Sequence, residues 1–368
     1  MNKKLIAAAI AGAFVAPAAF AQNSTVQIYG LLNAEYGFFN QQNTAAGAGR
    51  SSVDALGSGA SRIGFRGQEK LGGGMTAFWQ CESDIRFLSG GAATNGNLCD
   101  RNSALGLRGS FGSFYVGTWD SPLKRVAAIT RITNETGWLG TQLMTLSPGG
   151  GWTGAFSLRN VQSLNYDTPK FGGFSASFQT TTTNPGRGSN ALPTPKGRFT
   201  SMSGQYVQGP VAVVVGYSQH DDNRSTGGQG FDDTAWLIGG TYTFGAVKVG
   251  LTYADAEIET GVGASTERKS WNLAADWSLG GPHKVRFGYS DAGDAKTNAG
   301  GGANTGAKLW QVGYHHALSK RTSASLSYAR INNDSAGTYS FTGAPQGAAN
   351  IQPGDDGGVF VLGLVHTF

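Results

Sequence analysis

One long polar segment, residues 120–160, carries several charged side chains, and further arginines precede it in the sequence. Fixed charges do not make or break bonds, but a narrow water-filled passage with a low-dielectric wall focuses their field and so selects between anions and cations. The segment has neither a helical nor an alternating period, and a connection of this length is normally functional. We expect it to narrow such a passage, and the candidate charges are Arg62, Arg66, Arg101, Asp120, Lys124, Arg125, Arg131, Glu135 and Arg159.

No residue spacing points to catalysis or to a bound metal. The five histidines are scattered along the chain, and the adjacent pair His315 and His316 falls on opposite faces of any strand. The sequence shows neither a Ser/His/Asp arrangement nor a His/Cys spacing of the metal-binding kind. Glycine runs such as 71–74 precede no helix and are therefore not phosphate loops. We expect no enzyme activity, cofactor or metal, with an outer-membrane protease or lipase as the alternative.

The chain begins with the pattern of a secretory signal peptide. Lys3 and Lys4 precede an apolar run, and Ala19-Phe-Ala21 is a small-residue cleavage site. The run is shorter than the roughly 20 residues of a membrane-spanning helix. Residues 1–21 are therefore expected to be removed, leaving one domain over residues 22–368. Of the 28 Lys and Arg residues, two are Lys3 and Lys4; without them 26 stand against 23 Asp and Glu residues, and this excess of +3 is too small to indicate nucleic-acid binding.

Cys81 and Cys99 are the only cysteines in the sequence. In an exported protein, a pair that flanks one polar loop is most simply a disulfide. Cys81 shares strand parity with Ala77 and Trp79, so its side chain is expected to start out pointing away from the interior. The bridge would tie the ends of the connection at residues 87–99.

After the leader, alternating segments of about ten residues are separated by connections. In the first segment Val26, Ile28 and Leu32 share a face opposite Gln27 and Asn33, as in a half-apolar strand. Seven short turns and eight long connections would join sixteen strands, the pattern of a bacterial outer-membrane barrel with short turns at one end and long loops at the other. The long connections are expected at 40–60, 87–99, 121–158, 183–198, 221–233, 259–269, 294–306 and 335–357.

The distribution of side chains favours a barrel in a membrane over a soluble β-sandwich, which is the alternative. A sandwich turns its apolar faces inward to a core. Here the polar faces carry small and charged side chains that suit a water-filled lumen, and Tyr and Trp gather near strand ends, as at membrane interfaces. The expected interface residues include Tyr36, Trp119, Trp236, Trp271 and Tyr314.

Several motifs together resemble the betaproteobacterial general porins over essentially the whole mature chain. They are Ser24-Thr-Val-Gln-Ile-Tyr-Gly-Leu-Leu-Asn33, Ser61-Arg-Ile-Gly-Phe-Arg-Gly67, Asp100-Arg-Asn-Ser-Ala-Leu-Gly-Leu-Arg-Gly109, Tyr166-Asp-Thr-Pro-Lys-Phe-Gly-Gly-Phe174 and Gly363-Leu-Val-His-Thr-Phe368. The resemblance implies an all-β, sixteen-stranded antiparallel transmembrane barrel with a long third external loop folded into the lumen. It also implies a homotrimer in the outer membrane. The terminal Phe368 resembles the signal that the outer-membrane assembly machinery recognises.

The resemblance also assigns residues to the constriction. Arg62 and Arg101 stand where the family has lumen arginines on its second and fourth strands, and Arg159 matches one just before the sixth. Two features depart from the family pattern. Thr118 stands at a position that is usually Arg, and the 120–160 loop lacks the Pro-Glu motif, which leaves Asp120 and Glu135 as its acids.

These observations predict a channel for passive diffusion of small hydrophilic solutes and ions. Basic residues outnumber acids around the 120–160 loop, even with Glu35 and Glu82 counted on lumen-facing strand positions, so a weak to moderate preference for anions is expected. The alternatives are a substrate-specific outer-membrane channel and a surface or adhesive protein that uses its barrel only as an anchor.

Overall fold

The computed structural model describes residues 25–42, 50–88, 98–131, 156–183, 197–226, 229–298, 300–341 and 352–368. The expected leader at 1–21, the central part of the 120–160 segment and Glu135 lie outside these ranges. In the ranges that are described, no helix is long and apolar enough to cross a membrane.

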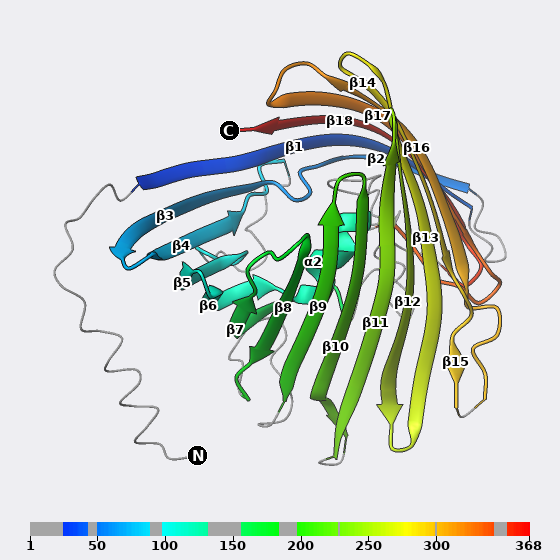
Figure 1. Cartoon of the computed structure of the whole chain (residues 1–368). Helices are drawn as coiled ribbons and strands as arrows, with labels where there is room; N and C mark the ends of the chain where they lie inside the picture. Colours follow the sequence, from blue (N-terminus) through cyan, green and yellow to red (C-terminus); the bar gives the residue numbers. More distant parts are fainter. Residues whose placement is uncertain are drawn as a thin grey trace.

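Eighteen strands form a single antiparallel sheet (Figure 1). They are β1 (Thr25–Gln42), β2 (Arg50–Gly57), β3 (Arg62–Gly72), β4 (Met75–Asp84), β5 (Ser103–Gly109), β6 (Gly112–Asp120), β7 (Arg159–Asp167), β8 (Phe174–Thr181), β9 (Arg198–Gln208), β10 (Val211–Thr226), β11 (Gln229–Phe244), β12 (Val247–Gly261), β13 (Ala264–Gly280), β14 (His283–Ala292), β15 (Lys296–Thr297), β16 (Ala307–Ala317), β17 (Thr322–Asn333) and β18 (Asp356–Thr367).

The sheet closes on itself because β18 pairs with β1. β2 and β3 pair with successive halves of β1, and β15 continues the pairing of β14 along β13. Each of these two pairs therefore makes one interrupted wall strand, and eighteen segments form the sixteen-stranded antiparallel barrel that the sequence predicts. Closure leaves no unpaired edge, which a bilayer does not tolerate.

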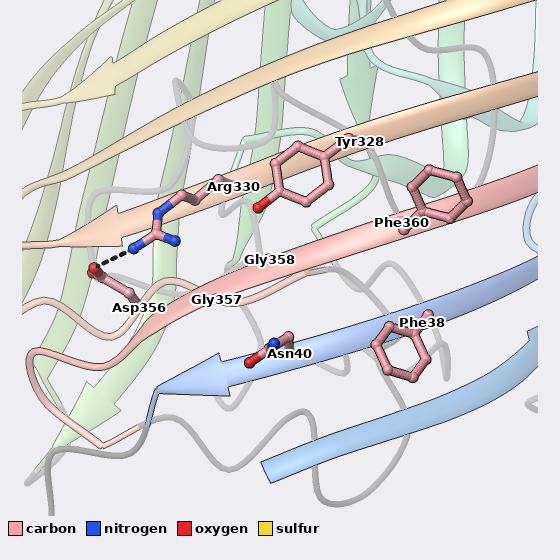
Figure 2. A pocket seen from close by; sticks show the side chains of 8 residues that line it. All are labelled: Phe38, Asn40, Tyr328, Arg330, Asp356, Gly357, Gly358 and Phe360. Atoms are coloured by element: carbon pink, nitrogen blue, oxygen red, sulfur yellow. Dashed lines mark hydrogen bonds and ion pairs between the residues drawn. The ribbon is translucent and has the colours of Figure 1, made fainter. Parts of the chain in front are cut away.

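Alternation along the strands gives the wall an apolar outer face and a mostly polar inner face. In β10, Val213 is 45% exposed whereas its neighbour Val214, which faces the interior, is 1% exposed. Aromatic side chains join the outer face, as Figure 2 shows for Phe38, Tyr328 and Phe360 on β1, β17 and β18 around a shallow groove of about 240 Å³. Such outer aromatics are typical of membrane interfaces. Trp119 differs from the expectation, because its ring contacts the buried ring of Tyr115 at 5.1 Å on the inner face.

The connections expected at 221–233 and 259–269 are wrong. β10 runs to Thr226 and β11 starts at Gln229, while β12 and β13 are joined by residues 262–263, with Gly263 at a φ of +66°. These strands have 15 to 17 residues, more than the roughly 9 to 11 that cross a bilayer. The inner faces of these strand ends bury polar side chains as well as apolar ones, for example His220 and Asp233, so a run of polar residues there does not mark a loop.

The expectation that the 120–160 segment contains no helix is also wrong. Pro122–Thr130 forms the helix α2, capped by Ser121, whose hydroxyl accepts a hydrogen bond from the Lys124 amide at 3.3 Å. Proline at the first helical turn after a serine cap is a recognised start signal. The helix has nine residues, too few for its helical period to stand out in the sequence. Its buried residues are Pro122, Leu123, Val126, Ala127 and Thr130.

A second connection also turns inward, at the end of the barrel where the long connections lie. Tyr339 and Phe341, which follow β17, are buried against the inner sides of β1, β16, β17 and β18. The Arg268 guanidinium lies 5.3 Å from the Tyr339 ring centroid. Burial raises the pKa of Tyr339 to about 12, so the hydroxyl stays neutral at any pH the outer membrane meets. We call this group the rim cluster: Phe39, Ala292, Ala307, Leu309, Ala329, Ile331, Tyr339, Phe341, Val359 and Val361.

Candidate functional site

Two arginines share one buried carboxylate on the inner face of the first wall strands. Glu82 on β4 lies 2.8 Å from Arg101 Nε through Oε1 and 3.7 Å from Arg62 Nε through Oε2. The Tyr29 hydroxyl donates to the same carboxylate at 3.1 Å, and the Arg101 amide donates to the Glu82 carbonyl at 2.9 Å. Asp84 lies 3.7 Å from Arg101 Nη1. The structure thus brings Arg62 and Arg101 together around Glu82, an acid on β4.

A second group lies where β6 and β7 meet helix α2. Asp120 Oδ1 is 2.8 Å from Lys124 Nζ and 3.2 Å from Arg159 Nε. The Asn102 side chain joins this group to its neighbour Arg101: its amide donates to Asp120 Oδ2 at 3.1 Å, and its carbonyl accepts from Arg159 Nε at 2.8 Å. We call the two groups together the charge network.

The charged side chains of the network differ in exposure. Glu82 is the deepest at 9%, and Arg62 and Lys124 are 30% and 29% exposed, whereas Arg101, Arg159, Asp84 and Asp120 are all close to 19%. The deepest charge is therefore an acid, and the more exposed charges are basic. Arg86 also belongs to the network, because its Nε lies 3.2 Å from Asp84 Oδ2. Five cationic side chains therefore stand against three carboxylates among the described residues: Arg62, Arg86, Arg101, Lys124 and Arg159 against Glu82, Asp84 and Asp120.

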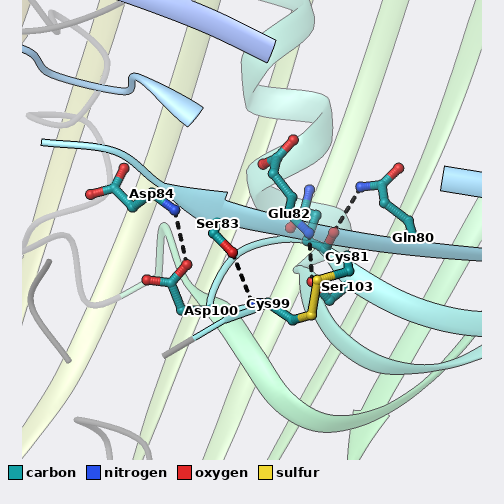
Figure 3. The surroundings of a disulfide bond; sticks show 9 residues. Gln80, Cys81, Glu82, Ser83, Asp84, Cys99, Asp100 and Ser103 are labelled. Carbon is teal, nitrogen blue, oxygen red and sulfur yellow. Dashed lines mark hydrogen bonds between the residues drawn. A yellow bond between two sulfur atoms is a disulfide. The ribbon is translucent and has the colours of Figure 1, made fainter. Parts of the chain in front are cut away.

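The disulfide between Cys81 and Cys99 is present, as the sequence predicts, and it supports the network (Figure 3). Backbone pairing between β4 and β5 stops at Gln80. Beyond it, one backbone bond remains, from the Arg101 amide to the Glu82 carbonyl, and side chains supply the others: the Ser83 hydroxyl accepts from the Cys99 amide at 2.9 Å, and the Ser103 hydroxyl accepts from the Glu82 amide at 3.0 Å. Cys99 is two residues from Arg101, so the bridge fixes the chain that carries this arginine.

Arg66 and Arg125 lie on the inner side of the barrel but outside the charge network. Arg66 donates to Gln27 at 2.9 Å, and its guanidinium lies 4.9 Å from the Tyr29 ring centroid. It is four residues from Arg62, or roughly 13 Å along the strand toward the short turns. Arg125 is held by both oxygens of the Asp167 carboxylate, at 2.7 and 3.1 Å. This close pairing cancels the Arg125 charge, so it adds little positive potential.

Two of the expected site residues, Arg131 and Glu135, remain. Arg131 directly follows α2 with an exposed side chain, and its amide donates to Ala128 O at 3.3 Å. Glu135 lies outside the described residues. Sequence reasoning overlooked Asp84, Asn102 and Asp167; the parity that Asp84 shares with Glu82 is the signal that could have found it. In the described ranges, no three His, Cys, Asp or Glu side chains are arranged to hold a metal.

Helix α2 follows β6 and packs on the inner face of the wall three to six strands further on, at β9 to β12. Leu123 and Val126 pack onto the inner face of β10, where a Cβ on Gly216 would come within 2.8 Å of Leu123 Cδ1. The Leu123 amide donates to Ser201 Oγ at 3.1 Å, and Thr252 Oγ1 donates to Thr130 Oγ1 at 2.5 Å. The start of the 120–160 segment therefore lies inside the barrel, on β9 to β12 (Figure 1).

Known proteins with this sequence pattern and this fold are outer-membrane porins. The family described as Gram-negative porin matches residues 7–336. The outer membrane porin protein 32 of Delftia acidovorans is 28% identical over the full length of both chains, and an outer membrane porin protein of Bordetella pertussis is 25% identical over 90% of this chain and 94% of its own. The solved anion-selective porin from Comamonas acidovorans is 26% identical, with a TM-score of 0.75 over 94% of this chain and all of that chain. The chain therefore belongs to the Gram-negative porin family and forms a channel of the bacterial outer membrane.

Proposed function

We propose that this porin passes small hydrophilic solutes and ions by passive diffusion and prefers anions weakly to moderately. The observation that carries the proposal is the net positive charge of the charge network. Its deepest side chain is the Glu82 carboxylate, and its three most exposed side chains, Arg62, Arg86 and Lys124, are all basic. Focusing by the low-dielectric wall strengthens the effect of this charge on an ion in the lumen. Five cations against three carboxylates give the described network a net positive charge.

Helix α2 supplies the narrowing in this proposal. It lies inside the barrel against the inner face of β9 to β12, while Tyr339 and Phe341 of the rim cluster fill part of the lumen near the long connections. Lys124 extends from the helix to Asp120, so the helix and the network share a charge pair. Solutes would pass beside both, and the cross-section left there would limit their size.

A sugar-specific channel is less well supported. Such a channel needs aromatic faces open to the lumen, on which sugar rings stack. The inner aromatics of β4 and β6 are covered: Tyr115 is 3% exposed and contacts both Phe78 and Trp119, and the Arg108 guanidinium lies 5.4 Å from the Phe78 ring centroid. These residues fill space beside α2 rather than form an open stacking surface.

The proposal is tested by two measurements on the reconstituted protein. Liposome swelling with neutral sugars of increasing size should show a cut-off set by size alone. Planar bilayers under a salt gradient should give a reversal potential of the anion-selective sign. Saturation by one sugar would replace the proposal with a specific channel, and absence of flux would replace it with a membrane anchor.

We also propose that the functional unit is a homotrimer and that Phe368 is recognised during assembly. Phe368 exchanges two backbone hydrogen bonds with Gly30, so the last residue closes the barrel against β1. Its ring lies on the outer face with Phe360, Leu362 and Leu364. An assembly factor can therefore bind this ring while β18 has not yet paired with β1. Native mass measurement of the detergent-solubilised protein should find three chains, and a monomeric or dimeric mass would contradict the trimer.

A further inference from the structure

Two histidines that are far apart in the sequence face each other across neighbouring strands. His283 begins β14, and His316 lies near the end of β16, directly opposite it in the register. Their Nδ1 atoms are 3.2 Å apart and their ring centroids 4.8 Å apart. Tyr314, two residues before His316, places its hydroxyl 2.6 Å from His283 Nδ1. Three donor atoms therefore converge at the barrel end with the short turns.

This trio lies on the outer face of the wall and is separate from the charge network. Val312 and Tyr314 point outward and are exposed, whereas Gln311 between β14 and β17 points inward and is buried. The ion pairs of Lys284 and Arg286 with Asp276 belong to the opposite, inner parity of these strands. No part of the trio is used by the proposed channel.

Hydrogen bonds cannot satisfy all three polar atoms at once, because His283 Nδ1 has two polar neighbours. One imidazole Nδ1 offers either one N–H or one lone pair, so His283 Nδ1 makes a full hydrogen bond to one of its two neighbours at a time. A cation between the three atoms would use the lone pairs of both nitrogens and the oxygen together. We propose that His283, His316 and Tyr314 bind one divalent transition-metal ion of the zinc class on the outer rim of the barrel.

The distance between the two histidine nitrogens fits that class of ion, and the Tyr314 hydroxyl, now 2.6 Å from His283 Nδ1, would move away from it by roughly 0.7 Å to become a third ligand. Zinc binds histidine nitrogen at about 2.0 to 2.1 Å, so two nitrogens on one tetrahedral zinc stand roughly 3.3 to 3.4 Å apart. The observed 3.2 Å needs only a small side-chain adjustment. The backbone holds the pair in place, because the Ala317 amide donates to the Pro282 carbonyl at 3.0 Å beyond it and the β14–β16 pairing continues on its other side.

The donor set also selects the ion. Imidazole nitrogens suit Zn²⁺, Cu²⁺ and Ni²⁺, whereas Mg²⁺ and Ca²⁺ prefer carboxylate and carbonyl oxygens, which this trio lacks. Water would complete the coordination, since both histidines are partly exposed. A bound ion would link β14 to β16 and stabilise the folded barrel, because it binds the folded chain and not the unfolded one.

The test uses folded, full-length protein in detergent, without a polyhistidine tag. Zn²⁺ titrated into the protein in a calorimeter should bind at one ion per chain, and Mg²⁺ should not. His283→Gln and His316→Gln should each abolish the binding. Tyr314→Phe should weaken it by about tenfold or more, the effect of removing a group that orients or joins the ligand set. The matched control is His315→Gln, a neighbour on the opposite face of the strand, and it should bind as the unmodified protein does.

Electron paramagnetic resonance of the protein with Cu²⁺ gives a second readout that needs no variant. Its spectrum should show coupling to two nitrogens. Each His→Gln variant that folds, judged by heat-modifiable mobility on gels, should lose this two-nitrogen spectrum. The absence of saturable Zn²⁺ binding, its survival in both His→Gln variants, or a copper spectrum without nitrogen coupling would each overturn the proposal.

Discussion

Removing the two arginines that share Glu82 is the most direct test of the charge network. Arg62→Ala with Arg101→Ala lowers the count of cationic side chains in the described network from five to three, against three carboxylates. Glu82 keeps the hydrogen bond from the Tyr29 hydroxyl. The Glu82 carboxylate would then keep its negative charge at the lumen without the two guanidinium groups that now neutralise it. The preference of the channel for anions should therefore disappear or reverse.

The size of the change can be worked from Coulomb's law. For an ion that passes about 5 Å away in water, one charge contributes roughly 0.8 kcal/mol, which screening at 0.1 M salt reduces to about 0.5 kcal/mol. Two charges shift the free energies of an anion and a cation by about 1 kcal/mol each, in opposite directions. The anion-to-cation permeability ratio should therefore fall roughly ten- to thirtyfold at 0.1 M salt and much less at 1 M, where the Debye length is about 3 Å.

The assay is the reversal potential of single channels in a planar bilayer under a salt gradient. The matched control is Arg66→Ala with Arg108→Ala, which removes two charges from the same inner face but outside the network; Arg66 contacts Gln27, and Arg108 contacts Gln68. The control should change the ratio clearly less than the network variant. Equal effects of the two variants, or an unchanged ratio in the network variant, would refute the assignment of selectivity to this network.

Three further predictions concern the elements that hold the site. Cys81→Ser should lower the free energy of unfolding by roughly 3 kcal/mol for a sequence separation of 18, measured by denaturant unfolding, and free thiols in the unreduced protein by mass spectrometry would contradict the bridge. Leu123→Ala, which removes a side chain with 0% exposure, should loosen α2 and raise both single-channel conductance and the sugar size cut-off, whereas Ala128→Ser on the exposed side should not. Phe368→Ala keeps the backbone bonds to Gly30, so it should reduce membrane insertion in cells while leaving refolding in detergent normal, and unchanged insertion would count against a recognition role.

The wall of the barrel could be predicted from the sequence because its physical cause is local. A strand between lipid and water must alternate apolar and polar side chains, and the short turns must carry residues that reverse the chain, so both signals lie in neighbouring residues. That is why the closed barrel and the outward parity of Cys81 follow from residue types alone. The same rule fails at the polar ends of the long strands: residues 221–226 of β10 are all polar, so the sequence does not mark them as strand.

What the tertiary structure decided is which distant residues meet. Register across the sheet places Glu82 between Arg62 and Arg101, and it sets His283 opposite His316 although 33 residues separate them. Helix α2 is stable because it buries its apolar side against β10 and β11, and no feature of residues 122–130 alone identifies that partner. The packing of α2 also brings Arg125 to Asp167, and this ion pair neutralises the Arg125 charge, which therefore adds little to the positive potential in the lumen. Local chemistry thus determined the barrel, whereas the field inside it depends on side-chain partners that only the closed sheet brings together.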